Sequence, residues 1–280
     1  MTHATGAELD RRFFVGLARA FGGAVFFSLP LLMTMEMWWL GFYAERTRLL
    51  LFMLVMVPVL VVLDHYSGFQ PTTTWAEDVE DGMIAYGVGL VTSFVVLFLF
   101  GIIDFTQPLR EVVGKVAIQS VPASLGAVLA TSQLAGDGQP EGPEEERKKE
   151  AGYWTEVFFM AAGALFLAFN VAPTEEMILI SFVMTPWHGL ALVVASLAMV
   201  HGFVYSSGFR GSPGVHGGAS RGSLFLRYSV VGYTTALLVS AYVLWTFGRY
   251  EGGTFTSYLM MAVVLGLPAS LGAAGARLIL

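Results

Sequence analysis

The sequence has no cysteine and few charged residues. Without cysteine, the chain can form neither a disulfide framework nor a thiolate metal site. Charged residues make up 13% of the 280 positions, whereas soluble domains contain about 25%. The formal net charge is −6 and no basic stripe with interleaved aromatic residues is present, which argues against nucleic acid as a partner. We therefore do not expect a soluble or a nucleic-acid-binding protein.

Motifs for catalysis and for cofactor binding are also missing. The sequence has no HExxH zinc motif, and its glycine-rich loop at residues 208–222 lacks the Gly-Lys-Ser/Thr ending of a phosphate-binding loop. The segment GASRG at residues 218–222 matches the G-x-S-x-G nucleophile elbow, but it lacks the strand-turn-helix context that the elbow requires. We expect no enzymatic activity, no cofactor and no metal site.

Long apolar segments are the main feature that the sequence does contain, because hydrophobic residues make up 55% of the chain. A helix needs roughly 20 residues to cross the hydrocarbon core, and such blocks differ from the short alternating segments of a porin-type barrel. We predict an all-α membrane protein with eight transmembrane helices, or seven or nine if residues 178–187 behave differently. The segments lie at about residues 13–41, 48–63, 83–103, 116–134, 153–173, 178–205, 228–245 and 257–280, with an acidic loop at residues 75–82.

The sequence also contains signs of an internal duplication. The hexapeptide PASLGA occurs twice, 146 residues apart. Earlier in the chain, Gly23 matches Gly163 at an offset of 140 residues, and Tyr86 matches Tyr228 at an offset of 142. The offset changes only between segments, where loops can differ in length. This pattern indicates a duplicated unit of four helices.

The duplication predicts how the chain is divided. Residues 1–135 form the first four-helix repeat and residues 151–280 the second, and the charged segment 136–150 links them. Each repeat contains an even number of membrane crossings, so both begin on the same side of the bilayer. We therefore predict parallel repeats, in contrast to the inverted repeats of many secondary transporters.

Each PASLGA segment lies in the last helix of its repeat. The proline frees a backbone carbonyl one turn earlier, and the small residues allow a neighbouring helix to approach closely in lipid. We interpret both segments as helix-packing sites, with the lining of a transport pathway as the alternative. The residues concerned are Pro122, Ser124, Gly126, Pro268, Ser270 and Gly272.

Two glutamates, Glu36 and Glu176, fall within apolar surroundings at equivalent positions of the two repeats. An ionised side chain inside a membrane helix costs at least a few kcal/mol unless it faces protein, water or an ion. Nearby prolines would leave backbone carbonyls free to coordinate a cation. The sequence thus predicts an ion-binding site for a small cation or a proton, formed by Glu36, Glu176, Glu175, Thr34 and Thr174.

These glutamates also have a purely structural interpretation. Glu36 is followed by Trp38 and Trp39, and paired tryptophans are typical of the aromatic belt at a membrane interface. Glu36 lies far enough from the middle of its segment to reach the head-group region. Both interpretations remain open from the sequence.

The distribution of basic residues predicts the orientation in the membrane. We count nine Lys and Arg residues on the side of the N-terminus and five on the other side. Basic residues accumulate in cytoplasmic loops, so we expect both termini in the cytoplasm. The lipid bilayer is the expected partner, and a homo-oligomer is compatible with these features.

The motif TMEMWW in the first segment is paired with NVAPTEEM in the fifth. With the chain length and the eight-segment plan, this pairing resembles an uncharacterised family of bacterial integral membrane proteins, a domain of unknown function. The resemblance implies a location in the bacterial inner membrane and no particular activity.

Two functions follow as hypotheses. The first is a cation or proton channel or transporter that uses the paired glutamates. The second is a membrane scaffold or sensor that transports nothing and binds a partner through the linker at residues 136–150 or the loop at residues 210–222.

Overall fold

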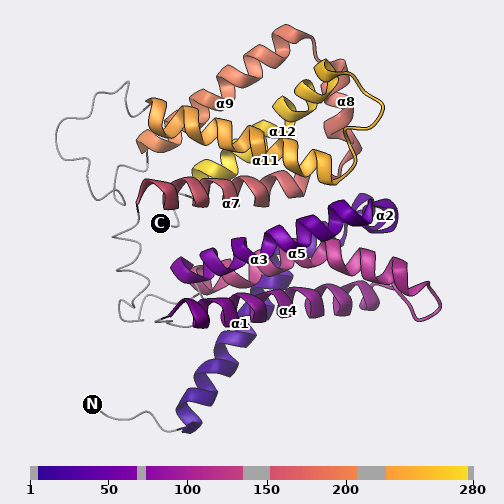
Figure 1. Cartoon of the computed structure of the whole chain (residues 1–280), viewed down its shortest axis with the longest axis vertical. Coiled ribbons are helices and arrows are strands. Elements are labelled where there is room, and N and C mark those ends of the chain that lie inside the picture. The colour runs from indigo at the N-terminus through magenta and orange to yellow at the C-terminus, as the bar shows by residue number, and fades with distance from the viewer. Residues whose placement is uncertain (1–5, 68–73, 135–151, 207–224, 277–280) are drawn as a thin grey trace, which may run out of the picture. The chain divides into compact units, whose positions relative to one another are not determined.

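The computed structural model describes residues 6–67, 74–134, 152–206 and 225–276, which form helices and connecting turns without any strand (Figure 1). The predicted all-helical class is therefore confirmed for these ranges. The chain divides into two compact units, Met1–Arg147 and Lys148–Leu280. The division falls within the segment predicted as a linker, which lies outside the described residues.

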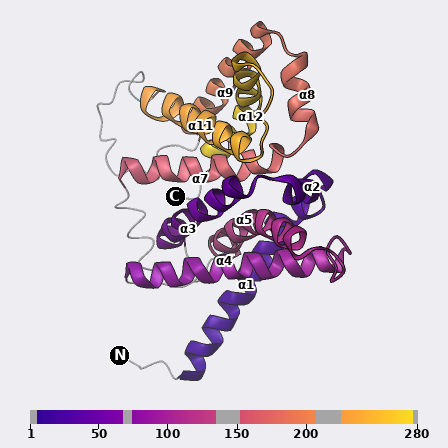
Figure 2. The same ribbon diagram turned by 45° about the vertical axis from the view of Figure 1, so that its right-hand side comes forward.

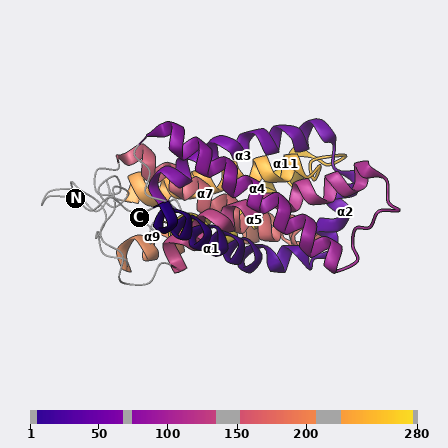
Figure 3. The ribbon, with the colours of Figure 1, turned by 90° about the horizontal axis from the view of Figure 1, so that it is seen from below.

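The first unit is built around its last helix. That helix, α5, contacts each of the four helices that precede it, and α3, α4 and α5 lie alongside one another (Figure 2). The short helix α2 lies at one end of the unit (Figure 3). The helices are α1 (Gly6–Leu32), α2 (Met35–Tyr43), α3 (Arg46–Ser67), α4 (Trp75–Leu99) and α5 (Leu109–Leu134).

The second unit has a similar order of elements. Its last helix, α12, contacts all four other α-helices of the unit. A π-helical segment, η1, runs directly into α11. The elements are α7 (Tyr153–Val171), α8 (Glu175–Val183), α9 (Pro186–Ser206), η1 (Phe225–Val230), α11 (Val231–Thr246) and α12 (Phe255–Ala276).

Eight helices are long and apolar enough to cross a membrane, as the sequence predicts. The helices that carry PASLGA are the most buried of them: 72% of the apolar window in α5 and 67% of that in α12 lie inside the protein, against 17–44% in the other six. Lipid-immersed helices associate through close packing rather than through the hydrophobic effect. The small residues of PASLGA therefore form the core of each unit.

The first predicted segment, residues 13–41, is wrong as a single helix. The chain leaves the helical conformation at Thr34, whose φ of −94° and ψ of 119° are extended, and α2 begins at the next residue. In the second unit, α7 ends two residues before Pro173, and Thr174 is also extended. Helices α2 and α8 are consequently separate from the membrane-spanning helices.

The acidic stretch at residues 75–82 is the first part of α4 and not the predicted loop. Thr74 and Glu77 form a capping box, in which each side chain bonds to the backbone N–H of the other residue. Such a box provides hydrogen-bond acceptors for two backbone N–H groups at the helix start. Acidic residues in the first turn also interact favourably with the positive end of the helix dipole. The acidic residues that suggested a loop in the sequence therefore form the start of a helix.

The ends of the elements correspond between the two units. The bounds of α2 and α8 are 140 residues apart, and the starts of α5 and α12 are 146 apart. Helices α4 and α11 are followed by Gly101 and Gly248, whose φ values of 69° and 70° are left-handed and whose positions differ by 147. This offset pairs Tyr86 with Tyr233, whereas the offset of 142 in the sequence pairs it with Tyr228, and all three tyrosines are buried. The duplication itself stays a prediction.

Candidate functional site

The predicted site residues lie at the junctions between a spanning helix and a short helix. Glu36 is in the first turn of α2 and half-buried, while Glu175 and Glu176 are exposed in the first turn of α8. All three lie outside the candidate membrane spans. Glutamates at these positions stabilise their helices, because their negative charge interacts favourably with the positive end of the helix dipole. Glu36 and Glu176 belong to different units, so a site shared between them stays a prediction.

Glu175 takes part in an ion pair at its junction. Its Oε1 lies 3.0 Å from Nη1 of Arg249, which follows α11. The same guanidinium donates a hydrogen bond through Nη2 to the carbonyl oxygen of Pro173. Arg249 therefore fixes the turn between α7 and α8 to the turn after α11. This arrangement already neutralises one of the carboxylates predicted to attract a cation.

The backbone carbonyls at the two junctions accept hydrogen bonds from side chains, contrary to the expectation that they are free. These hydrogen bonds hold the ends of the spanning helices, and a cation would have to displace them. The donors and acceptors are Thr34 Oγ1 to Pro30 O (2.6 Å), Gln119 Nε2 to Leu31 O (3.1 Å), Trp38 Nε1 to Leu32 O (2.7 Å) and Thr174 Oγ1 to Val171 O (2.8 Å).

The PASLGA glycines contact neighbouring helices in equivalent ways. A Cβ added to Gly126 would lie 2.7 Å from the carbonyl oxygen of Gly23 on α1, and one added to Gly272 would overlap the carbonyl oxygen of Gly163 on α7. The serines bond within their own helices: Ser124 Oγ donates to Ser120 O (2.7 Å) and Ser270 Oγ to Leu267 O (2.8 Å). Pro122 and Pro268 both lie inside continuous helices. These contacts are helix packing within each unit.

Five Asp, Glu or Lys side chains are buried among the described residues, and four of them interact with other groups. Lys115 is paired with Glu111, and Asp78 with His65. Asp64 and Glu156 also have interaction partners. The fifth is Asp81, which is 7% exposed.

His65 and Asp78 join the end of α3 to the start of α4. The Nδ1 atom of His65 lies 2.6 Å from Oδ2 of Asp78, and the imidazole stacks on Trp75 with ring centroids 4.1 Å apart. Asp78 is fully buried. This contact joins the side chains of the two helix ends directly.

Asp81 lies one turn further into the membrane-spanning part of α4. It has no hydrogen bond and no ion pair within the described parts of the chain, and the charges that act on it belong to Glu77, Asp78 and Glu80. It lies six residues before the middle of the 25-residue helix, roughly 9 Å along the axis at 1.5 Å per residue. The hydrocarbon core extends about 15 Å to each side of its middle. Asp81 is therefore a buried acid within a candidate membrane-spanning helix.

Sequence analysis missed Asp78 and Asp81 because it treated their segment as a loop. A signal was present, since Thr74 and Glu77 have the T-x-x-E spacing of a capping box. In a helix that begins there, residues 78 and 81 share one face. Their burial depends on the packing of α4 against α3, where Gly82 lies against Val61.

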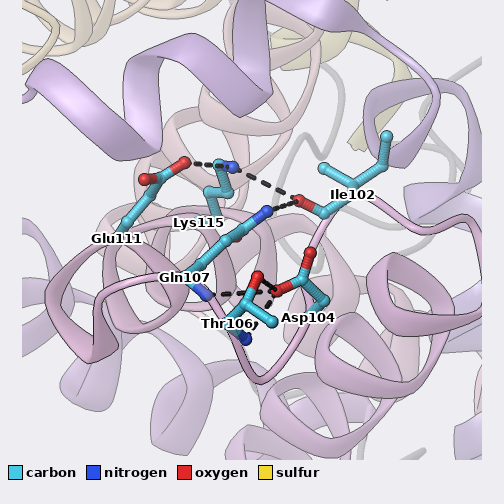
Figure 4. Close-up of polar contacts among 6 residues, drawn as sticks. All are labelled: Ile102, Asp104, Thr106, Gln107, Glu111 and Lys115. Carbon is cyan, nitrogen blue, oxygen red and sulfur yellow. Dashed lines mark hydrogen bonds and ion pairs between the residues drawn. The ribbon is translucent and has the colours of Figure 1, made fainter.

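A second polar cluster, drawn in Figure 4, lies where α4 ends and α5 begins. Lys115 Nζ lies 2.6 Å from Glu111 Oε1 and donates to the carbonyl oxygen of Ile102 at 3.3 Å. Gln107 Nε2 donates to the same carbonyl at 3.1 Å. These contacts tie α5 to the turn that follows α4.

Within that turn, Asp104 organises the backbone. Its Oδ1 accepts hydrogen bonds from the backbone N–H and hydroxyl of Thr106, at 2.7 and 2.5 Å, and from the backbone N–H of Gln107 at 3.1 Å (Figure 4). The hydrogen bonds from Thr106 lower the pKa of Asp104 below its usual value of 3.8. The carboxylate form therefore stabilises the turn.

A metal centre finds no support within the described ranges, where no three His, Asp or Glu side chains are grouped to hold an ion. Comparison with curated proteins and with solved structures gave no match. A family model described as "Putative integral membrane protein (DUF2391)" matches residues 16–280, a range that includes seven of the eight candidate membrane spans in full and all but the first two residues of the other. The chain is thus a multi-pass integral membrane protein and belongs to this family.

Proposed function

We propose that the protein transports a small cation or a proton across the bacterial inner membrane, and that Asp81 is the residue that binds the transported ion. The observation that carries this proposal is the burial of Asp81 in a candidate spanning helix, where it has no hydrogen bond and no ion pair among the described residues. An ionised side chain inside a membrane helix costs at least a few kcal/mol unless it faces protein, water or an ion. A bound proton or cation offsets this cost.

His65 and Asp78 are positioned to exchange ions with the adjacent compartment. Asp78 lies between Asp81 and the beginning of α4, and His65 contacts it from the end of α3. Both termini are proposed to be cytoplasmic, and α4 begins at the end of the first unit where α1 also begins. In this orientation the His65–Asp78 pair lies on the cytoplasmic side.

The junction glutamates are proposed to act at the outer side. Glu36 lies after α1 has crossed the membrane, and Glu176 occupies the equivalent junction of the second unit. Their partly or fully exposed carboxylates would raise the local concentration of cations. We propose that the two units are parallel repeats, and the matching bounds of α2 and α8 support this proposal. The acidic residues at the start of α4 have no acidic counterparts in η1, which precedes α11 in the second unit.

The test is ion flux into liposomes that contain the purified full-length protein. Gradients of protons, of Na⁺ and of K⁺ are imposed separately and followed with dyes inside the vesicles. The unchanged protein is expected to dissipate at least one gradient, and Asp81→Asn to abolish that flux. Asp104→Asn, which changes an exposed aspartate between the spans, serves as the matched control and should retain it. Equal flux through Asp81→Asn and the unchanged protein would remove Asp81 from the mechanism.

A scaffold or sensor that transports nothing is the second candidate. It is favoured by the side-chain hydrogen bonds that occupy the junction carbonyls and by the close glycine contacts inside each unit. This candidate predicts no flux of any tested ion and a copurifying partner. Loss of that partner on deletion of residues 136–150 or 210–222, which lie outside the described residues, would support it.

A further inference from the structure

A cavity of about 440 Å³ lies beside α2, at the end of the first unit that carries the Lys115–Glu111 pair. Small-molecule sites usually measure about 300–1,000 Å³. Trp38, Trp39 and Phe42 of α2 form its aromatic side, and Ile102, Glu111 and Lys115 form its polar side. Because α4 ends at Leu99, just before this turn, the cavity lies at the level where the membrane spans end.

The polar side of the cavity offers one positive and one negative group. Lys115 is 8% exposed, and its ammonium uses two of its three donors on Glu111 and Ile102 (Figure 4). Glu111 uses Oε1 for Lys115, while Oε2 has no hydrogen bond among the described residues. One N–H donor and one carboxylate oxygen therefore remain for a ligand, and the pair as a whole is neutral.

The aromatic side of the cavity faces outward. Trp39 is 59% exposed and Phe42 58% exposed, and tryptophan side chains prefer the boundary between head groups and acyl chains. Trp38 is held in place by its hydrogen bond to the carbonyl oxygen of Leu32. An amphiphile could lay its apolar part along Trp39 and Phe42 with its head group at Lys115 and Glu111.

From this combination we propose that the cavity binds the head group of a zwitterionic phospholipid that carries a primary amine, such as phosphatidylethanolamine. The lipid phosphate accepts a hydrogen bond from the remaining N–H of Lys115, and the lipid ammonium donates a hydrogen bond to Glu111 Oε2. Phosphatidylcholine has no N–H group for Glu111, and phosphatidylglycerol has no cation for it. A neutral pair of opposite charges thus selects a neutral lipid that carries both charges.

The second unit does not reproduce this pair. At the offset of 146 residues, Ser257 stands in place of Glu111 and the buried Met261 in place of Lys115. The lipid site is therefore a property of the first unit. Lys115→Met introduces a side chain that the corresponding buried position of α12 already accommodates.

The test measures lipid binding to the delipidated full-length protein in detergent. Phosphatidylethanolamine, phosphatidylcholine and phosphatidylglycerol with identical acyl chains are compared by native mass spectrometry and by the shift in thermal unfolding temperature. Phosphatidylethanolamine should bind most tightly. Lys115→Met should weaken its apparent affinity about tenfold or more, because one charge-assisted hydrogen bond is lost.

Two further variants separate recognition from folding. Trp39→Ala removes an exposed aromatic wall and should also weaken binding, whereas Arg110→Met, which changes an exposed cation of the same helix, should not. Equal affinity for phosphatidylethanolamine and phosphatidylcholine, or unchanged binding by both Lys115→Met and Trp39→Ala, would overturn the proposal. Water-soluble phosphoethanolamine that binds as tightly as the lipid would also overturn it. The readout is equilibrium binding, so it does not depend on ion transport.

Discussion

Replacing Gly272 by alanine tests whether the second PASLGA segment holds its unit together. The added Cβ would overlap the carbonyl oxygen of Gly163 and lie 2.7 Å from its carbonyl carbon, and these backbone atoms cannot rotate away. Overpacking of this kind costs about 1–3 kcal/mol. In the opposite direction, alanine is favoured over glycine inside a helix by about 1 kcal/mol.

Gly275→Ala separates these two effects. Gly275 lies three residues later in the same helix, and a Cβ there would meet no atom within 4 Å. Both variants gain the helix preference, so the difference between their free energies of unfolding isolates the overpacking cost of about 1–3 kcal/mol. Unfolding of the purified protein by SDS in mixed micelles, followed by circular dichroism, measures it. Equal stability of the two variants would refute the close contact between α7 and α12.

Two further predictions concern helix starts and turns. Thr74→Ala should lower the free energy of unfolding by about 1 kcal/mol in the same assay, because Glu77 loses its capping partner; an unchanged stability would show that α4 does not depend on this cap. The lowered pKa of Asp104 means that its contribution to stability is complete above pH 3.8 and is lost as the pH falls through the lower pKa of the folded state. In Asp104→Asn the free energy of unfolding should therefore fall less steeply below pH 3.8 than in the unchanged protein. If both proteins lose stability equally with falling pH, the hydrogen bonds from Thr106 to Asp104 are contradicted.

The number and type of spanning helices could be predicted from the sequence because hydrophobic length alone determines them. The junction at Thr34 could not, because apolar residues continue from α1 into α2 and conceal the change of direction. Helix ends depend on hydrogen bonds made after folding, such as that from Trp38 to the carbonyl of Leu32. Such contacts join residues whose pairing no local pattern reveals.

The candidate sites show the same limit. Glu36 and Glu176 attract attention in a sequence because they stand among apolar residues, yet in the structure they occupy exposed or half-buried helix starts. Asp81 and Lys115 lie in more polar stretches and are nevertheless buried. Burial of an ionisable group is decided by neighbouring helices, here α3 beside α4 and α2 beside α5. Composition along the chain does not contain that information.

The position of α5 and α12 at the end of their units has a consequence for biogenesis. Each contacts all other α-helices of its unit, yet each is synthesised after them. During translation the earlier helices enter the bilayer before α5 or α12 is present, although Gly23 of α1 and Gly163 of α7 pack against these last helices. A ribosome that stalls before residue 109 would leave three candidate membrane crossings whose packing faces are open to lipid.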